Sequence, residues 1–245
     1  MISKLKKLTS VVEQGIFRDL LRKGKPRSIA SHAIGRQLTK LAPGLEFVVD
    51  GGANRGQFSR AISQYFPNAK VVAFEPLPEM VATLHRNLGD LPNVTVVQKA
   101  LGKTDGKMVF NEYSDTQCSS FLDGVPDNAL LGSAQVVNRI EVEVCRLDTH
   151  FQGVDFGKPA LLKLDLQGFE EPAIQGAGQR LHDFQYVLVE CPLLRAYEGE
   201  ASFGELTVLM TNAGYETIGF LNVASRDGTI VQVDSLFAKT NHPVS

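Results

Sequence analysis

A short segment in the second half of the chain carries side chains suited to acid–base chemistry. It reads Lys163-x-Asp165-x-x-Gly168-x-Glu170, and a further carboxylate, Glu190, ends the next apolar run. Residues two apart in a strand point to the same face, so Lys163 and Asp165 are expected side by side. A charged pair at the end of a buried strand is costly unless it has partners, which predicts either an internal ion pair or a catalytic site. We favour the site.

In that site the three carboxylates are candidate general bases for removing a proton from a hydroxyl. Lys163 would orient one of them or lower the pKa of the acceptor hydroxyl. For Glu190 the capping of a helix is an alternative role. A magnesium ion held by Asp165 and Glu190 is also considered, although the metal-binding patterns His-Glu-x-x-His and paired Cys-x-x-Cys do not occur in the chain. No metal site is therefore predicted.

A glycine-rich turn, Asp50-Gly-Gly-Ala-Asn-Arg-Gly56, is the strongest local signal. Its glycines let the backbone turn sharply and pass close to a ligand, and Asp50 can accept hydrogen bonds from that ligand or from loop amides. Glu75 ends the next apolar run, at the edge where open α/β sheets bind their ligands. A carboxylate in that place can accept both hydroxyls of a ribose. The pattern therefore predicts a site for a cofactor that contains ribose.

The same spacing also approximates a dinucleotide-binding fingerprint, with Gly51, Ala53 and Gly56 followed by Glu75. An NAD(P)-dependent oxidoreductase is thus an alternative, although the chain lacks the Tyr-x-x-x-Lys pair of short-chain dehydrogenases. The turn is compatible, too, with a module that binds the cofactor without turnover, and with a tight turn whose role is purely structural.

The elements that position these residues follow from the alternation of apolar runs with helical patterns, which predicts parallel strands joined by crossover helices. Strands are expected at 46–50, 70–75, 94–98, 160–165 and 186–190, and helices at 56–66 and 78–88. Residues 214–220 and 230–238 are separated only by a turn-rich segment containing Asn222, Ser225 and Asp227-Gly228, which predicts an antiparallel hairpin. The expected fold is α/β: a Rossmann-like, doubly wound, mostly parallel sheet with a C-terminal antiparallel hairpin, the outline of class I methyltransferases.

Residues 103–145 break this alternation. Short strands are expected at 107–111 and 140–145, with a loop over 115–138. Long insertions in compact domains are usually functional or mobile. We interpret residues 112–140 as an acceptor-site loop or lid, and a family-variable decoration is the alternative.

The chain has 245 residues, 43% of them hydrophobic and 21% charged, which fits one large domain over 46–240 and an N-terminal helical segment over 1–45. The net charge of −2 gives no attraction to nucleic acid. With no apolar run long enough for a membrane span, no secretory signal and three dispersed cysteines, we expect a cytoplasmic protein.

Residues 1–27 carry eight basic residues against two acidic ones, with apolar positions at helical spacing. This predicts an amphipathic helix that packs on the main domain. Weak peripheral contact with a membrane surface is the alternative.

In order along the chain, these motifs resemble the FkbM family of methyltransferases over residues 45–240. The segments that carry the resemblance are Asp50–Gln57, Ala73–Pro78, Ala100–Gly102, Arg146–Asp148, Leu162–Glu170, Val189–Glu190 and Ser235–Lys239. Membership implies a Rossmann-like fold, S-adenosylmethionine as methyl donor, and O-methylation, often of sugars or polyketide hydroxyls. One departure is Gly51, where the family usually has a larger residue such as Val or Ile.

Carried over position by position, the resemblance assigns each part of the cofactor to a segment of this chain. The methionine end falls to the turn with Asp50, Gly51, Gly52, Asn54 and Gly56, the ribose diol to Glu75, and the adenine to Pro76, Ala100 and Leu101. The expected partner is a sugar, glycan or polyketide-type hydroxyl acceptor. Its specificity is expected to reside in residues 1–45 and 112–140, which lie outside the family pattern.

Overall fold

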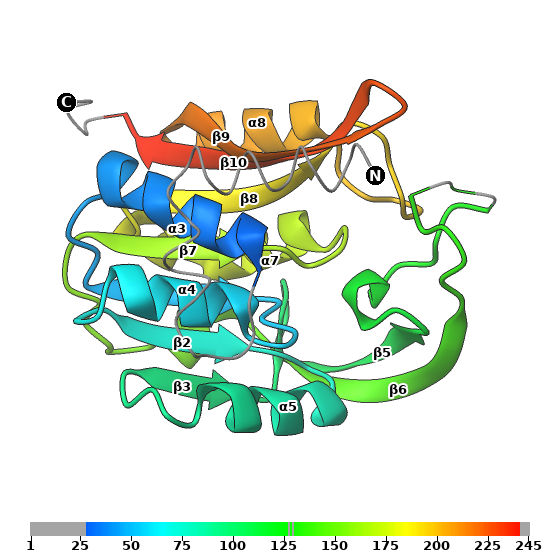
Figure 1. Cartoon of the computed structure of the whole chain (residues 1–245), viewed down its shortest axis with the longest axis horizontal. Coiled ribbons are helices and arrows are strands. Elements are labelled where there is room, and N and C mark those ends of the chain that lie inside the picture. The colour runs from blue at the N-terminus through cyan, green and yellow to red at the C-terminus, as the bar shows by residue number, and fades with distance from the viewer. Residues whose placement is uncertain (1–27, 127, 129, 241–245) are drawn as a thin grey trace.

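The computed structural model describes residues 28–126, 128 and 130–240, and its centre is a seven-stranded sheet (Figure 1). The strands are β1 (Phe47–Gly51), β2 (Lys70–Phe74), β3 (Val94–Val97), β7 (Ala160–Leu164), β8 (Tyr186–Pro192), β9 (Tyr215–Arg226) and β10 (Thr229–Lys239). Their order across the sheet is β3-β2-β1-β7-β8-β10-β9. The first five run parallel, whereas β10 is antiparallel to both of its neighbours. The predicted mostly parallel sheet with a C-terminal hairpin is confirmed.

Helices cover both faces of this sheet (Figure 1). One face carries α3 (Ile29–Leu41), α4 (Gln57–Tyr65) and α5 (Pro78–Leu88), and the other carries α6 (Leu147–His150), α7 (Glu170–Ala177), the 3-10 helix η2 (Gly178–Asp183) and α8 (Phe203–Asn212). Because neighbouring residues of a strand point to opposite faces, Val48 packs with α3 and α4 while Val49 packs with α6 and α7. The doubly wound architecture follows from strands that are apolar on both faces.

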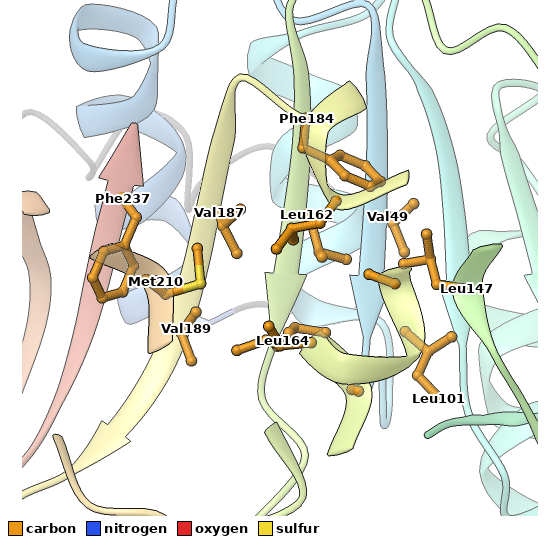
Figure 2. Packing of buried hydrophobic residues seen from close by; sticks show 14 of the residues in the cluster. Val49, Leu101, Leu147, Leu162, Leu164, Phe184, Val187, Val189, Met210 and Phe237 are labelled. Atoms are coloured by element: carbon orange, nitrogen blue, oxygen red, sulfur yellow. The ribbon is translucent and has the colours of Figure 1, made fainter. Parts of the chain in front are cut away.

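The hydrophobic core on the second face lies between the sheet and helices α6 to α8, and it is larger than the cluster that packs under α3 and α4. Figure 2 shows Leu162 and Leu164 of β7 among side chains that neighbouring strands and helices contribute to this layer. Those labelled beside them are Val49, Leu101, Leu147, Phe184, Val187, Val189, Met210 and Phe237, all of them buried. This packing fixes the carboxyl ends of β1, β7 and β8, from which functional side chains extend.

A second, three-stranded sheet extends from the carboxyl-end side of the main sheet (Figure 1). It consists of β4 (Ala100–Leu101), β5 (Gly106–Tyr113) and β6 (Val136–Cys145) in the order β4-β6-β5. The strands expected at 107–111 and 140–145 are therefore longer in the structure than predicted. The loop between them, expected over 115–138, spans residues 114–135 and contains the 3-10 helix η1 (Thr116–Cys118). The residues by which β5 and β6 extend beyond the expected strands are largely exposed. They therefore do not form the run of apolar side chains that marks a buried strand in a sequence.

The C-terminal hairpin is also longer than expected. Asn222 and Ser225, predicted to lie in a turn, are inside β9, and the turn itself is Asp227-Gly228. Both turn residues have left-handed backbones, with φ of 50° and 84°, as a two-residue hairpin turn of type I′ requires. Polar residues on the exposed face of a long strand were mistaken for a loop.

The described part of the N-terminal segment is α3, which packs into the main domain. Ser28 caps it by accepting a hydrogen bond from the Ser31 amide at 3.2 Å, and Ile34 and Leu38 join the core beside α4. Residues 1–27, where an amphipathic helix was predicted with weak membrane contact as the alternative, lie outside the described residues. Within the part of the chain that the structure describes, no helix is both long and apolar enough to cross a membrane.

Candidate active site

A cavity of about 370 Å³ opens where the carboxyl ends of β1, β2, β7 and β8 meet. The strand order reverses at this point, because the chain passes from β1 outward to β2 and β3 and then returns to β7 on the other side. Open α/β sheets bind ligands at such a switch point, and small-molecule sites occupy roughly 300–1,000 Å³. Most of the predicted site residues line the cavity: Gly52, Asn54, Glu75, Pro76, Ala100, Leu101, Lys163, Asp165 and Glu190.

Three members of the glycine-rich turn support the cavity wall from behind instead of lining it. Asp50 is fully buried, and its carboxylate accepts a hydrogen bond from the Ser59 hydroxyl at 2.6 Å. Gly51 ends β1, and Gly56 precedes α4 with a left-handed φ of 82°. These three residues therefore hold the turn in place, and their contact with the cofactor stays a prediction.

Lys163 joins the two segments that carry the site. Its ammonium lies 3.0 Å from Asp50 Oδ1 and 3.5 Å from Asp165 Oδ2, and it donates hydrogen bonds to the carbonyls of Gly51 and Gly52. Burial disfavours the charged form, but Asp50 and Asp165 outweigh burial and hold the pKa of Lys163 above its ordinary value. Lys163 is thus a permanent cation that fixes the turn and Asp165, so the ion-pair and site interpretations of this residue both apply.

Gly52 lies where the two segments touch. Its φ is +75°, and a Cβ atom built on it would lie 1.9 Å from the backbone oxygen of Asp165. No side chain fits there, so glycine lets the turn after β1 pack directly on the turn after β7.

Gly52→Ala is expected to lower the free energy of unfolding by clearly more than the roughly 1–2 kcal/mol of a left-handed alanine, because the backbone clash adds to it. The matched control is Gly44→Ala, which has a φ of +72° and open space around it among the described residues. Urea unfolding of both variants measures the difference. Equal losses would mean that the two turns can separate without cost.

Glu75 presents its carboxylate to the cavity while holding the turn. Oε2 accepts a hydrogen bond from the Asn54 amide and Oε1 from the Leu77 amide, both at 2.9 Å. A carboxylate has about four acceptor positions, so each oxygen can accept one more hydrogen. Burial raises the pKa of Glu75 to about 7, although the two backbone bonds favour the charged form. Glu75 therefore has two acceptor positions left, one on each oxygen, for two further hydrogen-bond donors.

Asp165 and Glu190 lie on either side of Gln167. The side-chain amide of Gln167 donates to Asp165 Oδ1 at 2.9 Å and to Glu190 Oε2 at 2.8 Å. Burial and the nearby charge of Asp165 raise the pKa of Glu190 well above its ordinary value. Gln167 thus holds the two acids together, and Glu190 is the one whose pKa is raised. Among the described residues, no group of three or more His, Cys, Asp or Glu side chains is arranged to hold a metal ion.

Glu170 does not reach the cavity. It is buried, and its Oε1 accepts a hydrogen bond from the Leu166 amide at 2.6 Å. Burial raises its pKa to about 8. Glu170 therefore stabilises the turn after β7, and of the three predicted candidate bases it is the one that does not line the cavity.

Among the cavity residues that were not predicted from the sequence are three polar ones, Gln167, Asn222 and Asp234. Asp234 of β10 is paired with Glu190 of β8 on one side and with Asn222 of β9 on the other. Burial, together with the charge of Asp165, raises the pKa of Asp234 to about 6. The available signal was an acidic residue between Val233 and Ser235, in a strand that is apolar at most of its other positions.

Within residues 112–140, predicted as an acceptor-site loop or lid, the segment between β5 and β6 also contacts the glycine-rich turn. Asn54 Nδ2 donates to the carbonyl of Thr116 at 3.2 Å, and Ser120 Oγ donates to the carbonyl of Gln167 at 2.6 Å. Phe121 lines the cavity and packs on Phe169, with ring centroids 4.5 Å apart. One segment thus contacts both the cofactor turn and the turn that carries the acids.

Comparison with known proteins gives consistent matches. A family model described as "Methyltransferase FkbM domain" matches residues 50–217. "Methyltransferase 1" of Beauveria bassiana (strain ARSEF 2860) is 26% identical over 187 residues, covering 71% of this chain and 73% of that protein. "Methyltransferase sdnD" of Sordaria araneosa is 26% identical over 198 residues, with 71% and 75% covered. The solved magnesium protoporphyrin IX methyltransferase of Synechocystis PCC 6803, with bound SAM, is 11% identical at a TM-score of 0.48, covering 87% of this chain and 77% of that one.

Proposed function

This chain belongs to the FkbM family of methyltransferases, and on that premise we propose that it transfers a methyl group from S-adenosylmethionine to a hydroxyl of a sugar, glycan or polyketide-type acceptor. The alternative of an NAD(P)-dependent oxidoreductase is wrong for a member of this family. One observation carries the proposal. A single cavity holds Glu75 beside the glycine-rich turn at the end of β2, and Asp165 with Glu190 at the ends of β7 and β8.

The cofactor end of the cavity fits an adenosyl group. The ribose diol would donate to the two remaining acceptor positions of Glu75, and the methionine end would lie along Gly52 and Asn54. The adenine would lie toward Ala100 and Leu101, in the apolar part of the cavity.

The other end of the cavity supplies the acid–base group. S-adenosylmethionine provides a methyl carbon on a positively charged sulfur that leaves readily, so positioning accounts for most of the rate. Asp165 would take the proton of the acceptor hydroxyl as the new O–C bond forms and the C–S bond breaks, with the electron pair staying on sulfur. Asp165 lies 3.5 Å from the Lys163 ammonium, whereas burial and the charge of Asp165 raise the pKa of Glu190, so we assign Asp165 as the base.

Glu75→Ala is expected to weaken S-adenosylmethionine binding about tenfold to a hundredfold, because two hydrogen bonds to a charged acceptor are lost in part to water. Isothermal calorimetry measures the affinity. Glu79→Ala, an exposed acid in the first turn of α5, is the matched control and should bind as the parent does. Unchanged affinity in Glu75→Ala would refute the ribose assignment.

The affinities of the parent and of Glu75→Ala can also be compared as the pH changes. Hydroxyl donors stabilise the ionised form of Glu75, so binding lowers a pKa that is about 7 in the free protein. The parent affinity should therefore decline as the pH falls through 7, relative to Glu75→Ala measured in the same buffers. The ratio of the parent affinity to the Glu75→Ala affinity cancels any effect of titrating the ligand itself. A ratio that stays flat between pH 8 and pH 5.5 would contradict hydrogen bonding to Glu75.

Two measurements test the function as a whole. Mass spectrometry of ligand that co-purifies with the protein identifies the cofactor. Incubation with S-adenosylmethionine and a panel of monosaccharides, nucleotide sugars, glycan fragments and polyketide alcohols should yield S-adenosylhomocysteine with at least one of them. A module without turnover would bind the cofactor and give no S-adenosylhomocysteine with any acceptor.

A further inference from the structure

Gln167 is held in an unusual backbone conformation at the centre of the candidate active site. Its φ is +54°, in the left-handed region that residues with a side chain rarely occupy. The Ser120 hydroxyl donates to its carbonyl at 2.6 Å, and Gly168 follows with a φ of +92°. Such conformations persist where the surrounding contacts determine them, and they cluster at functional sites.

The side chain of Gln167 is fixed at both ends. Its nitrogen donates one hydrogen each to Asp165 and Glu190, and its oxygen lies 3.1 Å from the hydroxyl of the buried Tyr197. The reverse amide orientation would face its oxygen toward two carboxylates, so these contacts determine which end is nitrogen. The amide therefore acts as a neutral bridge between two acids.

Neutrality distinguishes this bridge from the other groups that could fill the same place. A lysine would compensate both acids and weaken the basicity of the pair, whereas a glutamate would add a third negative charge among them. An amide donates one hydrogen bond to each acid and leaves the charge on the pair unchanged. Gln167 and Glu190 also line a second cavity of about 70 Å³, whereas Asp165 lines only the larger one.

We propose that Gln167 is a positioning residue for methyl transfer, whose amide holds Asp165 and Glu190 as one hydrogen-bonded pair facing the acceptor. The inference rests on the proposed function, because it assigns the pair to removal of the acceptor proton. Its structural part, the coupling of the two acids through the amide, is testable without any acceptor.

The test is a titration of the side-chain carboxyl carbons of Asp165 and Glu190 by ¹³C NMR, with assignments from Asp165→Asn and Glu190→Gln. In the parent, both resonances should respond together, as interacting sites do. Gln167→Glu adds a like charge and should raise both midpoints by about one pH unit or more. Gln167→Asn keeps the amide but shortens it beyond reach of one acid, so it should raise at least one midpoint by a smaller amount.

The matched control is Gln175→Glu in α7. Gln175 also donates to a carboxylate, that of Glu171 at 2.8 Å, but it is remote from the cavity lining. Its substitution should leave both midpoints within about 0.2 pH units of the parent. Asparagine tolerates left-handed backbone well, so Gln167→Asn provides a folded variant if Gln167→Glu does not fold.

Kinetics supply the second measurement, with the best acceptor from the panel above. Gln167→Asn should lower kcat at least tenfold while the KM for that acceptor and the affinity for S-adenosylmethionine change less than threefold. Midpoints that stay at their parent values in folded Gln167→Asn would overturn the positioning role. If midpoints move as expected but no acceptor in the panel is methylated, the bridge stands and the proposed function fails.

Discussion

Replacing Asp165 by asparagine is expected to slow methyl transfer by about 10²–10⁴, while the affinity for S-adenosylmethionine stays within several-fold of the parent. Asparagine has nearly the same shape but cannot take the acceptor proton at neutral pH. The substitution should spare the fold, because Asp165 is half-buried and its ion pair with Lys163, at 3.5 Å, is the longer of the two that Lys163 makes. Single-turnover rates at saturating cofactor measure the loss, and calorimetry measures the affinity.

Asp227→Asn is the matched control for this change. Asp227 is exposed in the turn of the C-terminal hairpin, and its left-handed backbone suits asparagine. It should keep the parent rate. Full activity in Asp165→Asn would remove Asp165 from the mechanism, and a loss of cofactor binding would reassign it to the cofactor.

The glycine-rich turn and Glu75 were predictable from the sequence because their geometry is local. Each follows directly from the carboxyl end of a buried parallel strand, and such ends meet at one edge of the sheet. The same logic placed Lys163 and Asp165 correctly, since strand alternation still governs both. The sequence pattern did not predict which acid pairs most closely with Lys163. In the structure the fully buried Asp50, behind the glycine-rich turn, is that partner.

Glu170 shows where that local logic ends. Beyond Asp165 the chain leaves the strand through Gln167 and Gly168, both with positive φ, and this reversal directs Glu170 behind the turn toward the Leu166 amide. A residue's distance along the chain from a strand end does not determine its direction once the backbone turns in this way. Only Gly168 marked the turn at the sequence level.

Asp234 was missed for the opposite reason, because long-range register decides its place. It faces the cavity only because β10 inserts antiparallel between β8 and β9 and aligns Asp234 with Glu190. The expected hairpin was shorter and gave no register against β8. Pairing between strands so far apart in the chain depends on packing across the whole sheet, which a sequence pattern does not contain.

Lys163→Met is expected to give the largest loss of stability, lowering the free energy of unfolding by about 3–5 kcal/mol. The substitution leaves Asp50 buried without its cation, and it removes the donor to the carbonyls of Gly51 and Gly52. Denaturant unfolding measures the change. The matched control is Lys107→Met, whose ion pair with Glu141 at 2.9 Å is largely exposed, so its loss should change the free energy of unfolding far less.

The double variant Asp50→Asn/Lys163→Met separates the ion pair from the packing of Lys163. Removing both charges should recover part of the loss, because most of it arises from one buried charge left without a partner. A second cycle with Asp165→Asn should show weaker coupling to Lys163, since Asp165 is farther from the ammonium and 38% of its side chain is exposed, against none for Asp50. Equal coupling to both acids would mean that Lys163 serves the proton acceptor as much as the turn. Stronger coupling to Asp50 would identify it primarily as the residue that joins the turn after β1 to the end of β7.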